Sequence, residues 1–350
     1  MLPLAEAPQS VCILRLSAIG DTCHVVPLVR SLQQAWPTTR LTWIIGRSEA
    51  RLMSLIEGVE FITLDKRSTG SGLRRLRRAL RTRRFDVLLH LQVALRASLA
   101  AACVPARIRL GFDRARAREL QWLFTNARVA PRAREHVLDS FLGFAAALGV
   151  PTGTPRWELP LPDAARDYAL RLIPDDQPTL LISPCSSHPR RNWLPERYAA
   201  VAAHAHRQHG LRVILCGGPS PQEQRFGAQI SAACDAPLIN QIGRDTLPEL
   251  LALLARARVL LAPDSGPAHM ATMVGTPVLG LYAATNPARS GPYRSRQWCI
   301  DQYPVAARIY RGVEPQELPW GHKIEDDGVM KLISVEEVNA ALDRLLGARA

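Results

Sequence analysis

Long apolar runs and paired cysteines are missing from this chain of 350 residues. No stretch approaches the run of about 18 apolar residues that a membrane-spanning helix needs. The first ten residues lack a basic segment followed by a long apolar one, so we predict no signal peptide and a cytoplasmic location. None of the seven cysteines forms a C-x-x-C pair, and we expect buried thiols in a reducing compartment rather than disulfides or a zinc site.

Signatures of dinucleotide, nucleic-acid and metal binding are missing as well. The turn after the first predicted strand contains Gly20 and Asp21 but does not read G-x-G-x-x-G. We find no helix-turn-helix, RRM or zinc-finger pattern, and no aromatic residues interleave the basic segments. His204, His206 and His209 lack the i, i+4 spacing of a helical metal pair, so we expect a solvated helix face and no bound metal.

Positive charge is what the chain has in excess: 44 basic and 31 acidic residues give a net charge of +13. Such a charge attracts polyanions, whether nucleic acid, an anionic bilayer face or a phosphorylated substrate. Much of it lies in two arginine-rich stretches, which could equally form solvated helix faces. The arginines of these stretches are Arg74, Arg75, Arg77, Arg78, Arg81, Arg83 and Arg84, then Arg107, Arg109, Arg114, Arg116 and Arg118.

Short β-like runs alternate with longer helical ones, first over residues 11–148 and again over residues 179–281. The predicted strands are 11–16, 41–45, 59–64, 85–91 and 107–110, then 179–183, 211–215, 237–240, 259–262 and 277–281. The predicted helices are 22–35, 49–57, 73–83, 136–148 and 164–172, then 195–208, 221–233, 247–255 and 335–346. This alternation indicates an α/β chain with two doubly wound parallel sheets.

A proline-rich and polar stretch separates the two alternations. We predict an N-terminal Rossmann-like domain over residues 1–162, a linker over 163–178 and a C-terminal Rossmann-like domain over 179–333. Ser334 and Glu337 form a capping box for a final helix, and we expect residues 334–350 to pack back on the N-terminal domain. Ligands of such sheets bind at the carboxyl ends of strands, which favours substrate binding between the two domains.

Asp21 follows the first strand at the expected start of a helix. Aspartate is a favoured N-cap, so this residue could serve only to cap the helix. Gly20 beside it allows a tight turn and the close approach of a ligand. The carboxylate could instead accept a proton from an attacking hydroxyl group.

Three further motifs follow strands of the second alternation. Asp264-Ser265-Gly266-Pro-Ala-His269 favours an anion site at a helix N-terminus over a plain turn. Ser186, Ser187 and Arg191 stand before a helix and could hold a diphosphate, although the adjoining Trp193-Leu-Pro is also typical of a hydrophobic staple. Glu223, after Gly217-Gly218, could contact ribose hydroxyls or be a surface glutamate beside a turn.

These four stretches, in this order, resemble the ADP-heptose:lipopolysaccharide heptosyltransferase family, glycosyltransferase family 9. The opening strand, glycine and aspartate match Leu14 to Asp21, and the family's D-[ST]-G-x-x-H motif matches Asp264 to His269. The run from Gly275 to Tyr293 resembles the family's downstream segment, and the similarity spans about residues 11–345. The run Gly111 to Asn126 resembles the enzymes that add the first heptose more than those that add the second.

The resemblance implies a GT-B fold, in which two Rossmann-like domains face each other across a cleft. It implies inverting, metal-independent transfer from ADP-heptose, with no further cofactor, and Asp21 as the general base. It also implies diphosphate contacts from Ser265, Gly266 and His269, a ribose contact from Glu223 and a donor-sugar contact from Asp264. In one respect the chain departs from the family, because Arg191-Asn-Trp193 stands where first-heptose enzymes often have K-x-W; arginine keeps the charge but cannot become a neutral amine.

The resemblance also implies an acceptor, the anionic inner core of lipid A with its 3-deoxy-manno-octulosonic acid or heptose residues. This acceptor is presented at the inner face of the inner membrane, where we expect the chain to bind peripherally. Its carboxylates and phosphates, with anionic lipid, are expected to be bound by Arg74, Arg75, Arg77, Arg78, Arg114, Arg116 and Arg118.

Two alternatives stand beside this interpretation. One is a GT-B transferase or epimerase that uses a different nucleotide sugar. The other is a basic protein that binds nucleic acid or membranes and carries a degenerate site, but the presence of an acid, a phosphate turn and a ribose-side glutamate argues against it. We therefore expect no nucleic-acid partner.

Overall fold

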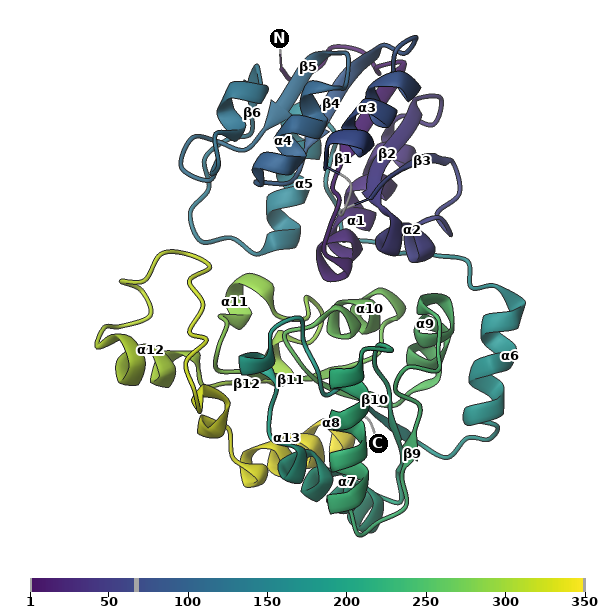
Figure 1. The fold of residues 1–350 in the computed structure, drawn as a ribbon, viewed down its shortest axis with the longest axis vertical. Coiled ribbons are helices and arrows are strands. Elements are labelled where there is room, and N and C mark those ends of the chain that lie inside the picture. Colours follow the sequence, from purple (N-terminus) through teal and green to yellow (C-terminus); the bar gives the residue numbers. More distant parts are fainter. Residues whose placement is uncertain (1, 66–68, 349–350) are drawn as a thin grey trace. The chain divides into compact units, whose positions relative to one another are not determined.

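The computed structural model describes residues 2–65 and 69–348, which fall into two compact units, 1–160 and 161–350 (Figure 1). The predicted N-terminal and C-terminal segments therefore include residues 1, 66–68, 349 and 350, which lie outside the described residues. No helix of residues 2–65 and 69–348 is long and apolar enough to cross a membrane.

The first unit is built on a parallel sheet with the strand order β3-β2-β1-β4-β5-β6 among its described residues. All five residues of β1 are buried, because helices cover both faces of the central strands. The strands are β1 (Ser10–Leu14), β2 (Arg40–Gly46), β3 (Val59–Leu64), β4 (Phe85–His90), β5 (Ala106–Gly111) and β6 (Ala127–Arg128).

The helices of the first unit alternate with these strands. His136 caps α5, its Nδ1 accepting a hydrogen bond from the Leu138 amide at 3.1 Å. The helices are α1 (Ile19–Ala35), α2 (Arg47–Met53), α3 (Thr69–Ala79), α4 (Leu95–Ala102) and α5 (Val137–Leu148), with the 3-10 turn η1 (Gln121–Phe124).

The second unit repeats the same topology, with the strand order β12-β11-β10-β7-β8-β9 and parallel pairing among its described residues. In each sheet the first strand of the unit lies beside the fourth, which is the doubly wound arrangement that the sequence predicts. The strands are β7 (Thr179–Ile182), β8 (Arg212–Leu215), β9 (Ile239–Asn240), β10 (Val259–Pro263), β11 (Val278–Tyr282) and β12 (Cys299–Asp301).

Capping motifs define several helices of the second unit. The predicted capping box is present, since the Ser334 hydroxyl accepts from the Glu337 amide at 3.1 Å and the Glu337 carboxylate accepts from the Ser334 amide at 2.9 Å. The helices are α6 (Asp163–Leu172), α7 (Pro195–His209), α8 (Pro221–Ala233), α9 (Leu247–Arg256), α10 (Gly266–Val274), α11 (Pro287–Ser290), α12 (Tyr303–Arg311) and α13 (Val335–Gly347). The 3-10 turns are η2 (Pro189–Arg191), η3 (Arg296–Trp298) and η4 (Val329–Leu332).

Two segments belong to the second unit that the sequence analysis assigned elsewhere. α6, expected as part of a linker, packs on α9. α13, expected to pack on the N-terminal domain, instead contacts α7 and buries Val338, Leu342 and Leu345 in the core of the second unit. Its apolar stripe is satisfied there, so the helix is an integral part of this unit.

Candidate functional site

The predicted motifs of both units lie at the carboxyl ends of strands, next to the point where the strand order reverses. In the first unit this point lies between β1 and β4, and Asp21 follows β1. In the second unit it lies between β7 and β10, which precede Ser186 and Asp264 respectively. Ligands of doubly wound sheets bind at such switch points, so the topology marks one candidate site in each unit.

Asp21 lies in the first turn of α1 rather than at its N-cap. The helix begins at Ile19, because the Thr22 amide already donates to the Ala18 carbonyl oxygen at 2.9 Å. From this third helical position, Oδ2 of Asp21 accepts a hydrogen bond from the Ala18 amide at 3.2 Å. Asp21 therefore reaches back to the helix start, and its side chain remains 32% exposed.

Arg15, which the sequence motifs did not indicate, also binds the Asp21 carboxylate. Its Nη2 lies 2.5 Å from Oδ2 of Asp21, and its Nη1 donates to the Leu91 carbonyl oxygen at 2.7 Å. The guanidinium carbon lies 5.3 Å from the centre of the Phe141 ring. The one signal for Arg15 in the sequence is its position directly after β1, six residues before Asp21.

Ser265 is the N-cap residue of α10, yet its hydroxyl does not cap the helix. Its Oγ is buried and has no hydrogen-bond partner among the described residues. The first turn of α10, which Ser265 precedes, has amides without partners inside the helix and carries the positive end of the helix dipole. A buried hydroxyl of this kind is costly unless a ligand pairs with it, so this turn suits a bound anion, as the motif predicts.

Asp264 occupies the opposite side of the same turn. Its Oδ1 lies 3.8 Å from Nε2 of His269, and its Oδ2 accepts from the Ser290 hydroxyl at 3.3 Å. Burial opposes ionisation, but hydrogen bonds from His269 and Thr285 and the positive charge of Arg191 outweigh it and hold the pKa of Asp264 below its ordinary value. The motif thus presents a charged carboxylate next to a site for an anion.

Arg191 approaches this carboxylate from the loop after β7. Its Nε and Nη2 contact Oε1 of Glu325 at 2.7 and 2.6 Å, and its side chain is only 12% exposed. Ser186 supports the loop, because its amide donates to Asn192 Oδ1 at 2.7 Å and its hydroxyl donates to the His188 carbonyl at 3.0 Å. Ser187 is exposed. The structure therefore brings Arg191 near Asp264, with Ser186 in a positioning role within the loop.

Lys323 is a residue of this cluster that the motifs did not reveal. Loss of hydration and the nearby charge of Arg191 hold the pKa of Lys323 below its ordinary value, against the opposing charges of Glu325 and Asp264. The Ile324 amide fixes this segment by donating to the Ala284 carbonyl at 2.8 Å, just after β11. Lys323 is one of the three lysines of the chain. It supplies an amine near Arg191, the residue at the lysine position of the K-x-W pattern.

Glu223 turns back onto its own loop. Its carboxylate accepts from the Gly218 amide at 2.6 Å and from the Ser220 hydroxyl at 3.0 Å. A Cβ atom at Gly217 or Gly218 would lie 3.0 or 2.8 Å from this carboxylate. The space beside these two glycines is therefore occupied by the Glu223 carboxylate.

Asp245, between β9 and α9, is a second acid near this loop. Its Oδ2 is buried with no hydrogen-bond partner among the described residues. Burial, reinforced by the negative charges of Glu249 and Glu223, raises the pKa of Asp245 to about 7. Asp245 therefore keeps its proton to a higher pH than an exposed aspartate does.

The predicted acceptor-binding arginines divide into exposed and internal groups. Arg74, Arg75, Arg77 and Arg78 are all exposed on α3, while Leu76 of the same helix is buried. Arg114 and Arg118 are exposed as well, with Arg114 lying 4.5 Å from the centre of the Trp122 ring.

Arg116 differs from these arginines because its guanidinium is bound within the first unit. It pairs with Asp113 and Glu135 and donates to the Ala130 carbonyl at 3.0 Å. Arg116, which we expected to contact the acceptor, therefore makes contacts that stabilise its own segment of the first unit.

The family model that describes glycosyltransferase family 9 (heptosyltransferase) matches residues 73–311. The chain belongs to this family. It is 41% identical to the lipopolysaccharide core heptosyltransferase OpsX of Haemophilus influenzae, over 98% of this chain and 99% of that protein. The family, and the glycosyltransferase activity that the sequence motifs predicted, are confirmed.

Solved structures of this family share the fold of the transferase. The family 9 glycosyltransferase of Veillonella parvula superposes with a TM-score of 0.79 at 22% identity, covering 97% of both chains. The Escherichia coli heptosyltransferase WaaC with ADP gives a TM-score of 0.71 at 17% identity, covering 97% of this chain and 98% of that one. At these identities the likeness establishes the fold, which confirms the predicted GT-B class.

Proposed function

We propose that this heptosyltransferase moves heptose from ADP-heptose to the inner core of lipopolysaccharide, inverting the anomeric carbon without a catalytic metal. Three relationships support the substrates: membership of family 9, the 41% identity to a lipopolysaccharide core heptosyltransferase, and the shared fold with an ADP-bound heptosyltransferase. The observation that carries the donor assignment is the buried, unpaired hydroxyl of Ser265 at the start of α10.

The second unit binds the donor in this proposal. The α10 amides, the Ser265 hydroxyl and His269 receive the diphosphate, whose negative charge matches the helix N-terminus. Arg191 and Lys323 supply positive charge that stabilises the departing ADP. The ionised Asp264 faces the donor sugar, where its carboxylate accepts hydrogen bonds from hydroxyl groups.

The first unit supplies the base. As the acceptor hydroxyl oxygen forms a bond to the anomeric carbon, Asp21 takes up the hydroxyl proton. The bond from the anomeric carbon to the diphosphate oxygen breaks, and ADP leaves with that electron pair. A single displacement of this kind inverts the anomeric centre, and its proton and charge balance need no metal.

The exposed arginines of α3, with Arg114 and Arg118, bind the anionic acceptor and the lipid surface that presents it. Guanidinium groups pair with carboxylates and phosphates, and basic side chains near anionic lipid each contribute about 1 kcal/mol of binding. All six side chains are exposed, four of them on α3 and those of Arg114 and Arg118 between β5 and η1, which leaves them available for this contact.

The test is transfer from ADP-heptose to heptose-less lipid A core by the purified protein, with the product anomer assigned by NMR. Transfer is expected to continue in EDTA, and Asp21→Asn is expected to abolish it while preserving ADP affinity. Asp163→Asn, which removes another first-turn carboxylate from the exposed start of α6, is the matched control. Turnover with UDP-sugars alone would instead support the alternative of a different nucleotide-sugar enzyme.

A further inference from the structure

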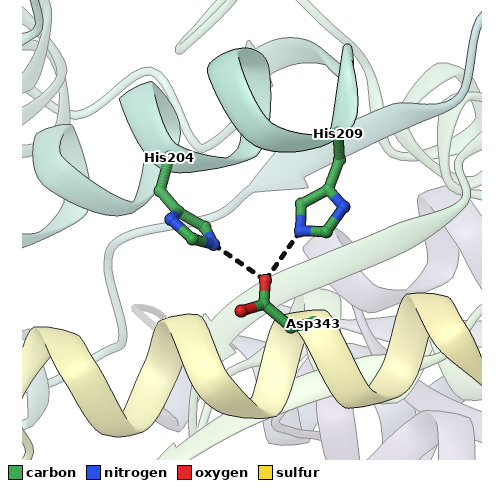
Figure 2. Close-up of side chains that lie close together, drawn as sticks. All are labelled: His204, His209 and Asp343. Carbon is green, nitrogen blue, oxygen red and sulfur yellow. Dashed lines mark hydrogen bonds and ion pairs between the residues drawn. The ribbon is translucent and has the colours of Figure 1, made fainter.

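Two histidines of α7 and one aspartate of α13 converge on a single point in the second unit. Nε2 of His204 lies 2.8 Å and Nε2 of His209 lies 2.6 Å from Oδ1 of Asp343. Figure 2 shows both imidazole rings pointing at this one carboxylate oxygen. One ligand atom from each of the three residues lies within 4.8 Å of the others.

The sequence interpretation considered α7 alone. Residues five apart point about 140° away from each other around a helix, so His204 and His209 do not form a metal pair on α7 by themselves. α13 packs on α7, and Asp343 stands between the two imidazoles. Tertiary packing therefore completes a set of ligands that the spacing of histidines on one helix does not reveal.

The donor set has the chemistry of a zinc-class site. Two imidazole nitrogens and one carboxylate oxygen are typical of zinc centres that keep a fourth position for water. Magnesium and calcium prefer oxygen ligands only, whereas imidazole suits zinc, copper and nickel. We propose that His204, His209 and Asp343 bind one divalent cation of this class, with Zn²⁺ as the reference ion.

The geometry requires only small movements to admit the ion. Bonds of about 2.0–2.1 Å in a tetrahedral site place ligand atoms about 3.3 Å apart, so each imidazole must draw back from Asp343 by roughly half an ångström. The side chains of His204, His209 and Asp343 are 23%, 27% and 45% exposed, which gives them room to move and gives the ion a path from solvent.

The position of this cluster makes the metal a structural element. His209 and Asp343 also line a cavity of about 840 Å³ together with Pro178, Leu211 and Arg258. These three residues directly precede β7, β8 and β10, whereas Asp264 follows β10. The metal thus lies at the amino ends of these strands, and the candidate donor site lies at their carboxyl ends. There the metal links α13 to α7.

Zinc titration of the full-length, tag-free protein after EDTA treatment tests the proposal. Calorimetry is expected to give one zinc per chain, with affinity falling at least tenfold in His204→Ala and in His209→Ala. His206→Ala is the matched control on the same helix, because Nδ1 of His206 lies 3.3 Å from the Leu211 carbonyl oxygen, outside the cluster. Zinc is expected to raise the melting temperature of the parent and of His206→Ala by several degrees, but not that of the two other variants.

Two further measurements separate folding and other ligands from the proposed site. Asp343→Asn retains a hydrogen-bonding oxygen but loses the charge, so it is expected to fold, to keep transferase activity and to bind zinc more weakly. Co²⁺ is expected to give the intense visible bands of a tetrahedral site in the parent and not in His209→Ala. The proposal would be overturned if the parent bound no stoichiometric zinc. It would also be overturned if His204→Ala and His209→Ala bound zinc as tightly as the parent, as expected when cysteines hold the ion.

Discussion

The guanidinium of Arg15 and the carboxylate of Asp21 form an ion pair at 2.5 Å, directly after the first strand. Arg15 is nearly buried, with 12% of its side chain exposed, and is also bound to the Leu91 carbonyl. The pair therefore connects the start of α1 to the end of β4. This link fixes one side of the Asp21 carboxylate.

Arg15→Gln is expected to act on catalysis through the position of Asp21. We expect kcat to fall about 10- to 100-fold with little change in donor KM, because a misplaced base is costly while the donor contacts are untouched. Arg15→Lys should recover part of the loss, since it restores the charge. A rise in donor KM with unchanged kcat would contradict this role.

Ser265→Ala removes the unpaired hydroxyl of the donor turn. ADP affinity should fall about 10- to 100-fold, the value of about one hydrogen bond to a charged group, and calorimetry measures it directly. Ser231→Ala is the control, because that hydroxyl donates to the Gly227 carbonyl at 2.9 Å within α8. Equal ADP affinity in the parent and Ser265→Ala would show that this hydroxyl does not bind ADP.

Lys323→Gln removes the amine beside Arg191. We expect about a tenfold loss of ADP affinity, since one positive charge near the diphosphate is lost. Lys331→Gln, at an exposed lysine in η4, controls for the change in net charge. If both variants bind ADP as tightly as the parent, Lys323 does not contact the diphosphate and only stabilises its own loop.

Charge reversal on α3 tests the acceptor surface. Arg74→Glu with Arg78→Glu should raise acceptor KM and weaken binding to anionic liposomes, with the difference from the parent shrinking in high salt. Arg166→Glu with Arg171→Glu makes the same change in charge on the exposed face of α6. Equal effects of the two pairs would mean that net charge, and not α3, governs acceptor binding.

Asp245→Asn should stabilise the protein more at high pH than at low pH. The folded pKa of about 7 lies above the ordinary aspartate pKa of 3.8, so the folded state keeps this proton to a higher pH than the unfolded state does. The stability that Asp245 contributes is present below about pH 3.8 and is lost as the pH rises through about 7. Between pH 5 and pH 8 the advantage of the variant should grow by on the order of 2 kcal/mol. Denaturant unfolding at both values measures this, and an equal difference at the two would contradict it.

Local patterns predicted most strands and helices, because burial of parallel strands produces short apolar runs between amphipathic segments. α4 was not predicted, since Leu95–Ala102 is short and rich in alanine and shows little contrast between its faces. β12 and α12 likewise follow the last strand that the pattern marked.

The motif residues at strand ends could be predicted from the sequence, whereas their partners could not. Asp264 and His269 lie within six residues of one another, so local order reveals them. Glu325 and Lys323 reach Arg191 only through the fold, from more than 130 positions away. The same holds for Asp343, which no spacing of histidines on α7 indicates.

The packing of α13 on α7 has a consequence for synthesis on the ribosome. The first unit has all of its strands and helices once residue 160 has left the exit tunnel, and it can fold while the rest is made. The second unit lacks Leu342 and Leu345 of its core until residue 345 has been translated. At about 5–20 residues per second, β7 waits roughly 10–30 s for this helix and β12 only about 2–9 s. Over these intervals the apolar surface of the strands can be bound by chaperones.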